Sequence, residues 1–342
     1  MSDLRIAMLG TGAQGASIGA DLQLAGLDVT FIEQWPDHVE AMRKNGITVN
    51  LPTRTINAKV KALHLCEVAE LREKFDVVFI VTKAYDTKWS CQLIEPYVKS
   101  DGLVVGLQNG MSIDAIASVV GPHRTIGAVI EIASNMFVPG VTNRQNDKDT
   151  SWFAVGGYDA ATKGRAESIA NILKHTGTVE VTSDIRSSKW MKLVVNAAEL
   201  VPSAILNLPL AAAARVPGML EFMRQAGYEA IHAALASGSR IVPIFGMSGV
   251  DPSKPEKVVD DLFDEVLKTF SMESTLTTTL QDWRKGRRGE TDDVNGYVVE
   301  WLEKVGKSSP INLRVVEIAH KIESGQLDAD PSNIKLLLDA VK

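Results

Sequence analysis

"LRIAMLGTGAQGASIGADLQLAGL", from Leu4 to Leu27, decides the fold of the first half of this chain. The apolar run over 4–10 predicts a buried strand, and the apolar spacing over 13–27 predicts a helix directly after it. In a glycine turn of this kind the first glycine permits the tight turn, the second lets a pyrophosphate approach the backbone, and the third lets the helix pack closely on the strand. The pattern predicts a dinucleotide site, with a purely structural turn as the alternative. Its residues are Gly10, Thr11, Gly12, Ala13, Gln14 and Gly15.

An acidic residue ends the next predicted strand, "DVTFIE", at Glu33. A carboxylate at this place accepts hydrogen bonds from the hydroxyls of the adenosine ribose, and it would repel the 2′-phosphate of NADP. Glu33 therefore favours NAD(H), although NADP(H) stays open. A solvated glutamate at a strand end is the alternative interpretation.

The rest of the first half alternates short apolar runs with amphipathic ones. Further strands are predicted over 75–83 and 102–110, with 125–133 and 151–157 as extensions of the same sheet. Their continuous apolar character is typical of a parallel sheet buried on both faces, so the fold class is α/β with a doubly wound, Rossmann-like sheet. We place this dinucleotide-binding domain at residues 1–183.

After residue 183 the sequence changes from alternating elements to helices, with no convincing strand among them. Helices are predicted over 187–206, 217–237, 255–286 with at least one break, 293–305 and 311–323. The stretch 238–255 is rich in Gly, Pro and Ser and is expected to be a loop. The all-helical domain is placed at residues 184–342.

The composition is that of an ordinary globular protein, with 45% apolar and 23% charged residues and a net charge of −6. This balance gives no general attraction to nucleic acid or to an anionic membrane. The two cysteines form no zinc-like cluster, and no metal site is predicted. Since neither a signal peptide nor a long apolar span is recognised, we expect a cytoplasmic location.

A lysine and an asparagine interrupt an apolar helical run in "SSKWMKLVVNAAELVP", from Ser187 to Pro202. Lys192 and Asn196 have a spacing of four, so a helix places them on one face. Burial lowers the pKa of a lysine and allows its amine to act as a general acid near neutral pH. The alternative is that Lys192 reaches solvent along the surface of an amphipathic helix.

Two further polar residues follow predicted strands at the carboxyl edge of the sheet, where open α/β sheets bind ligands. They are Lys83 and Asn109, although "NG" at 109–110 is also a common turn dipeptide. In the second half, "LQDWRKGRRGETDDVNG" (280–296) carries several carboxylates, one of which could be the partner that a buried amine requires.

The motifs "GTGAQG", "VTK", "LQNG", "KWMKLVVN" and "LQDWRKGRRGETDDVNG" occur in this order, and in this the chain resembles the ketopantoate reductases (2-dehydropantoate 2-reductases) of pantothenate biosynthesis. The resemblance implies a Rossmann domain followed by a helical domain similar to that of 6-phosphogluconate dehydrogenase. It also implies an NAD(P)-dependent oxidoreductase that transfers a hydride from NAD(P)H to the keto carbon of a 2-oxo acid. The first candidate substrate is 2-dehydropantoate.

The resemblance also implies roles for individual residues. Lys192 would be the general acid and Glu290 a second catalytic residue that orients substrate and helps set the protonation of the lysine. Asn196, Thr278, Asp282 and Asn109 would bind substrate, and Lys83 and Asn109 would line the nicotinamide pocket. A small-molecule substrate and a homodimer are the expected partners.

The chain departs from the family pattern at two positions of the substrate pocket. Leu200 stands where a further asparagine is usual, and Thr278 stands where a serine is usual. A less polar 2-oxo acid or a related carbonyl compound is therefore an alternative substrate. A non-catalytic protein that senses dinucleotides is an alternative of another class.

Overall fold

The computed structural model describes residues 4–341 and divides them into two compact units. The first comprises the chain up to Gln108 and residues 112–185, and the second comprises Asn109–Met111 and the chain from Arg186 onward. The sequence places the boundary after residue 183. The long helix α7 (Ile185–Ile205) begins at the division itself.

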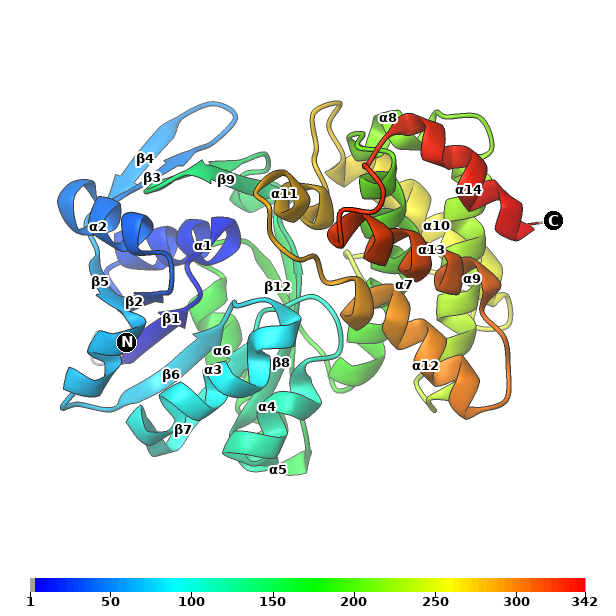
Figure 1. Ribbon diagram of the computed structural model, residues 1–342. Coiled ribbons are helices and arrows are strands. Elements are labelled where there is room, and N and C mark those ends of the chain that lie inside the picture. Colours follow the sequence, from blue (N-terminus) through cyan, green and yellow to red (C-terminus); the bar gives the residue numbers. More distant parts are fainter. Residues whose placement is uncertain (1–3, 342) are drawn as a thin grey trace. The chain divides into compact units, whose positions relative to one another are not determined.

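An eight-stranded sheet with the order β12-β11-β8-β7-β6-β1-β2-β5 forms the centre of the first unit (Figure 1). Its strands are β1 (Arg5–Leu9), β2 (Asp28–Glu33), β5 (Lys61–His64), β6 (Phe75–Ile80), β7 (Val98–Gly106), β8 (Thr125–Glu131), β11 (Trp152–Gly157) and β12 (Thr178–Val181). All neighbours are parallel except β8 and β11, which are antiparallel. The sheet is thus a Rossmann-type sheet in which the two strands β11 and β12, at one edge, run opposite to the other six, rather than purely parallel.

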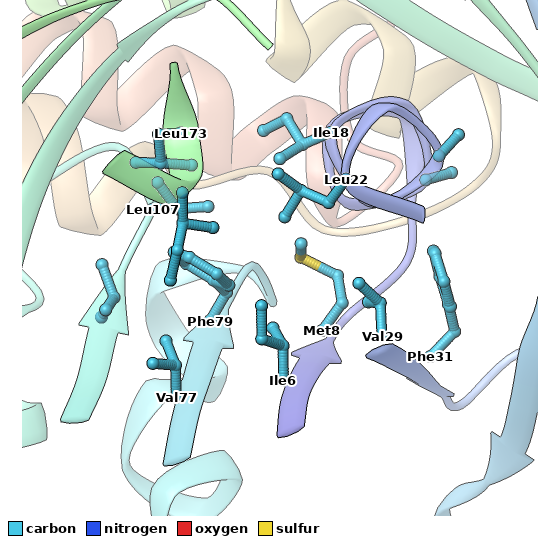
Figure 2. Packing of buried hydrophobic residues seen from close by; sticks show 14 of the residues in the cluster. Ile6, Met8, Ile18, Leu22, Val29, Phe31, Val77, Phe79, Leu107 and Leu173 are labelled. Carbon is cyan, nitrogen blue, oxygen red and sulfur yellow. The ribbon is translucent and has the colours of Figure 1, made fainter. Parts of the chain in front are cut away.

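Helices cover both faces of this sheet, which explains the unbroken apolar runs of its strands. They are α1 (Ala13–Leu24), α2 (Pro36–Asn45), α3 (Thr87–Ile94), α4 (Ile113–Val120), α5 (Ala160–Lys163) and α6 (Ala166–Leu173), with short 3₁₀ turns at 65–70, 84–86, 95–97, 122–124 and 148–150. Ile6 and Met8 of β1 point toward Ile18 and Leu22 of α1 (Figure 2). Ala7 and Leu9 pack into a separate core with α3 and α4. Successive residues of a strand therefore point to opposite faces of the sheet and pack into two different cores.

A second, four-stranded sheet with the order β4-β3-β10-β9 was not predicted. It consists of β3 (Ile47–Asn50), β4 (Thr55–Ala58), β9 (Ser134–Val138) and β10 (Val141–Arg144). It packs on α1, so that this helix is buried along both sides. The buried ion pair between Arg144 of β10 and Asp21 of α1, at 2.7 Å, joins the sheet to the helix.

The second unit contains helices and no strand among its described residues, as predicted. Its elements are α7, α8 (Leu210–Ala214), α9 (Met219–Ala236), α10 (Pro255–Glu265), α11 (Thr278–Arg284), α12 (Tyr297–Lys304), α13 (Pro310–Glu323) and α14 (Ile334–Leu338), with π-turns at Val266–Phe270 and Asp292–Gly296 and 3₁₀ turns at 331–333 and 339–341. Helix α9 contacts α8, α10, α12, α13 and α14 and is the centre of this unit. The predicted helix 255–286 is broken after Phe270, and α8 and α14 were not predicted.

Candidate active site

The loop at residues 10–15, here called the glycine loop, has the geometry of a phosphate cradle. Gly10 has φ +90°, and a Cβ there would lie 2.6 Å from the backbone nitrogen of Thr82. A Cβ on Gly15 would lie 2.1 Å from the carbonyl oxygen of Gly10, so both positions require glycine. Gly12 is different, because a Cβ there would meet nothing within 4 Å. The space beside Gly12 is the space that a pyrophosphate needs.

The N-terminus of α1 completes this cradle. Gly12 is the N-cap residue, no side chain caps the helix, and its first turn contains no acidic residue. The first N–H groups of a helix have no partner within the helix, and the positive end of the helix dipole lies there. Together these features fit the pyrophosphate of a dinucleotide.

Glu33 ends β2 as predicted, and its carboxylate holds the glycine loop. One oxygen accepts hydrogen bonds from the backbone N–H of Thr11 (2.6 Å) and from the Thr11 hydroxyl (3.0 Å). The other accepts from the N–H groups of Gln34 (2.8 Å) and Trp35 (3.0 Å). Four donors fill the acceptor sites of a carboxylate. A ribose hydroxyl at Glu33 would therefore share an oxygen with one of these donors.

His38 is a further residue of this site that sequence reasoning missed. Its Nε2–H donates to the carbonyl oxygen of Thr11 (2.8 Å), and its Nδ1 accepts from the N–H of Gly140 (2.9 Å). Complete burial lowers its pKa, which keeps the ring neutral in this tautomer. Glu33 and His38 therefore fix Thr11 from both sides. Since Gly140 is far away in the sequence, no local pattern could have indicated the contact.

Lys83 and Asn109 follow β6 and β7, two neighbouring parallel strands, as expected. Gln108 holds the turn at Lys83, because its side-chain amide donates to the carbonyl oxygens of Thr82 (2.8 Å) and Lys83 (3.2 Å). Asn109 is grouped with the second unit. In the glycine loop, Gln14 donates to the carbonyl oxygen of Ile132, and Ala13 is the first residue of α1.

Buried polar residues occupy one face of α7, here called the lysine face: Lys189, Lys192, Asn196 and Glu199. The Nζ of Lys192 lies 4.0 Å from Oε1 of Glu199, two turns along the helix. Among residues 4–341, neither amide atom of Asn196 has a hydrogen-bond partner, although the residue is only 1% exposed. Such an amide costs free energy unless a ligand binds it. We had not assigned Glu199, whose spacing of seven from Lys192 was a usable signal.

The structure holds the segment 277–295 against α7 at both of its ends. The hydroxyl of Thr277 donates to the carbonyl oxygen of Leu200 (3.0 Å) and pairs with that of Ser203 (3.2 Å). Asn295 donates to the carbonyl oxygen of Ala197 (3.0 Å). These contacts hold both ends of the segment on the part of α7 that follows Asn196.

The predicted residues of this segment differ in burial, because Thr278 is half-buried and the two carboxylates are buried. Thr278 is the first residue of α11, and its buried hydroxyl oxygen has no partner within residues 4–341. Asp282 lies in the same helix, and Glu290 lies just before the π-turn Asp292–Gly296; both are buried. Burial, with the neighbouring charge of Glu290, raises the pKa of Asp293 to about 6. The region therefore contains several carboxyl groups at close quarters.

Lys189, one turn before Lys192, was not assigned from the sequence. Burial lowers its pKa from 10.5 to about 8. The sequence predicts a lowered pKa for Lys192, and the lowered lysine pKa that the structure shows is that of Lys189.

Within the part of the chain that the structure describes, no three His, Cys, Asp or Glu side chains are grouped as metal ligands would be. No helix described between residues 4 and 341 combines the length and apolar character that a bilayer span requires.

Two family descriptions match the chain in succession. The model of "Ketopantoate reductase PanE/ApbA" matches residues 6–156, and that of its C-terminal domain matches residues 184–323. A 2-dehydropantoate 2-reductase of Archaeoglobus fulgidus is 28% identical over 94% of this chain and 98% of its own length. One of Pyrococcus horikoshii is 26% identical over the same shares of the two chains.

Solved structures agree with these matches. A PanE/ApbA family ketopantoate reductase from Ralstonia eutropha has a TM-score of 0.78 at 25% identity, covering 94% of this chain and 99% of that one. A D-mandelate dehydrogenase in complex with NADH and anilino(oxo)acetate has a TM-score of 0.83 at 20% identity, with the same coverage, and shows a shared fold.

A Rossmann-type sheet with an open glycine loop, followed by a helical unit with a buried lysine face, together with these family matches, defines an oxidoreductase. The glycine loop fits the pyrophosphate of a dinucleotide cofactor. The chain belongs to the ketopantoate reductase family.

Proposed function

We propose that this protein reduces a 2-oxo acid at the keto carbon with a nicotinamide dinucleotide, and that 2-dehydropantoate is the first candidate substrate. The observation that carries the proposal is the lysine face of α7, where Lys192 and the unpartnered amide of Asn196 lie one turn apart. A buried amine beside an amide with no partner is suited to a carbonyl substrate, which needs a proton donor and an orienting hydrogen bond.

The residues of the second unit would divide the work at the carbonyl group. Lys192 donates the proton to the oxygen of the keto group, and Glu199, at 4.0 Å, favours the charged form of the amine before that transfer. Asn196 orients the substrate through its free amide. Thr278 and Asp282 contact the rest of the substrate, and Glu290 helps to orient it.

The residues of the first unit would hold the cofactor, whose chemistry is the supply of a hydride. The N–H groups at the start of α1 bind the pyrophosphate beside Gly12. Lys83 and Asn109 line the nicotinamide pocket. Glu33 places a carboxylate beside the ribose, so NADH is preferred over NADPH, whose 2′-phosphate it would repel.

A second candidate keeps this chemistry and changes the substrate. Leu200 is buried and follows Asn196 by one turn, so it offers the substrate a methyl-bearing wall where the family pattern has an amide. A less polar 2-oxo acid would fit such a wall better than 2-dehydropantoate, which carries a hydroxyl group.

A panel of 2-oxo acids, assayed with NADH and with NADPH, tests the proposal. We expect turnover of at least one 2-oxo acid, with a higher kcat/KM for NADH than for NADPH at a fixed substrate concentration. Binding of the dinucleotide without oxidation by any 2-oxo acid would refute the proposal and favour a dinucleotide sensor instead.

A further inference from the structure

The loop between α9 and α10, residues 238–254, is fixed against α7. The hydroxyl of Ser187, in the first turn of α7, accepts a hydrogen bond from the N–H of Arg240 (2.9 Å). Ile241 and Ile244 are buried and anchor the loop to the core of the second unit. The segment has no helix or strand, yet its course beside α7 is determined by these contacts.

A tight turn in this loop holds an aromatic residue in an unfavourable backbone conformation. The N–H of Met247 donates to the carbonyl oxygen of Ile244 (3.1 Å), and the two residues between them both have positive φ: Phe245 at 61° and Gly246 at 71°. Turns of this geometry favour Asn, Asp or Gly, because the left-handed region is disfavoured for bulky side chains. The contacts of the Phe245 ring must therefore offset this conformation.

Those contacts place the ring at the lysine face. The ring centroid of Phe245 lies 5.3 Å from the Nζ of Lys192. On another side it lies 5.3 Å from the ring centroid of Phe270, with a tilt of 49° between the planes. Phe270 ends the π-turn after α10, and both rings are only partly buried. We call these two rings the aromatic wall.

We propose that Phe245 determines substrate specificity: its ring contacts the side chain of the 2-oxo acid and, with Phe270, selects acids with an aromatic or bulky apolar side chain. This inference rests on the reductase function proposed above and develops its second candidate, a 2-oxo acid less polar than 2-dehydropantoate. A keto oxygen that receives a proton from Lys192 lies about 3 Å from its Nζ. Because the ring centroid is 5.3 Å from the same atom, groups attached to the keto carbon on that side meet the ring.

The apolar character of the aromatic wall explains why it would select substrates with aromatic or bulky apolar side chains. A ring face cannot replace the hydrogen bonds that a hydroxyl group, such as that of 2-dehydropantoate, loses when it leaves water. An aryl side chain instead gains offset or edge-to-face contact with both rings. Leu200 lacks hydrogen-bonding groups in its side chain and so adds to the same preference.

The test compares kcat/KM for phenylpyruvate and benzoylformate with that for 2-dehydropantoate in the wild type, Phe245→Leu and Phe245→Asn. We expect the wild type to prefer an aryl acid, and both variants to lower the ratio about 3- to 10-fold. Asn suits the left-handed backbone, so Phe245→Asn should fold at least as stably as the wild type. Phe222→Leu makes the matched change in the core of α9 and should leave the ratio unchanged.

A preference of the wild type for 2-dehydropantoate, or an unchanged ratio in both Phe245 variants, would overturn the inference while leaving the reductase function intact. If no 2-oxo acid is reduced, the proposed function fails instead. Equilibrium binding of phenylpyruvate to the NADH-loaded protein then decides about Phe245: binding weakened in Phe245→Asn supports its contact with the ligand, and unaltered or absent binding refutes it.

Discussion

Replacing Asn196 with Leu should stabilise the protein and at the same time remove most of its activity. Leu has the same branched side-chain skeleton as Asn but no polar atoms. Since both amide atoms of Asn196 are buried without partners in the described chain, the substitution removes a penalty rather than an interaction. This opposite movement of stability and activity is expected of a residue kept for ligand binding.

The size of the effect follows from the burial of Asn196. Leaving a buried amide without hydrogen bonds costs about 1–3 kcal/mol in proteins. The two methyl groups that replace it gain contact with an apolar helix environment, and slight overpacking offsets part of that gain. We therefore expect the free energy of unfolding to rise by about 1–3 kcal/mol. Loss of the orienting hydrogen bond should lower kcat/KM by about 10²-fold.

Urea unfolding followed by circular dichroism, with kcat/KM from NADH oxidation, measures both quantities. Asn295→Leu is the matched control, because Asn295 is equally buried but donates to the carbonyl oxygen of Ala197 and to the side chain of Asn312. That variant should lose about 1–3 kcal/mol, since its former partners stay buried. If Asn196→Leu were destabilised like Asn295→Leu, the idea of an amide reserved for substrate would be wrong.

Three further substitutions test separate parts of the site. Lys192→Ala should lower kcat by at least about 10²-fold and leave the Kd for NADH, measured by fluorescence titration, within about twofold; unchanged turnover would remove Lys192 from the mechanism. Gly12→Val should place its side chain in the open space of the glycine loop, raise the Kd for NADH at least about tenfold and change the unfolding free energy by no more than about 0.5 kcal/mol. The pKa of Lys189 is about 8 in the folded protein and 10.5 in the unfolded chain, so the unfolded chain binds more protons between these two pH values. The free energy of unfolding of the wild type should therefore rise from pH 8 to pH 10.5 by about 3 kcal/mol relative to Lys189→Met. Parallel stability curves for those two proteins over that range would contradict the burial of a titrating amine.

Local patterns were sufficient to predict the first dinucleotide-binding elements. The strand, turn and helix from Leu4 onward show their apolar pattern within a few residues, and so does the strand that ends at Glu33. In each case a glycine or an acidic residue marks the end of the element close by. The longer helices of the second unit were predictable for the same reason, whereas the five-residue helices α8 and α14 were not. Lys192 and Asn196 share a face because four residues make about one helical turn, whatever the rest of the chain does.

The second sheet could not be predicted in the same way, because its pairing is long-range. Strand β3 pairs in parallel with β10, from a distant part of the sequence, and each has four residues. Such short strands have too few residues to establish an alternating pattern. The roles of Arg144 and His38, which depend on this sheet, were hidden for the same reason.

Two residues of the site were missed for different reasons. Phe245 belongs to an irregular loop, where periodicity gives no information. Its position beside Lys192 depends on a left-handed turn that the sequence "IFGM" does not predict. Glu199 has a spacing of seven from Lys192, which indicates a shared helix face, whereas the resemblance to the ketopantoate reductases points to the carboxylates of the 280–296 segment. The ion pair within α7 is the nearer and simpler solution.

Three unfavourable features of the second unit lie on or beside helix α7. Within residues 4–341 the amide of Asn196 is buried without partners, burial lowers the pKa of Lys189, and Phe245 has a left-handed backbone beside Lys192. In the first unit, by contrast, the buried carboxylate of Glu33 is fully hydrogen-bonded. Strain and unsatisfied groups persist when the surrounding structure over-determines them, and they gather at functional sites. A substrate that hydrogen-bonds Asn196 and covers Phe245 would recover part of this free energy on binding. The affinity for that substrate would then be higher, with no rearrangement of the lysine face.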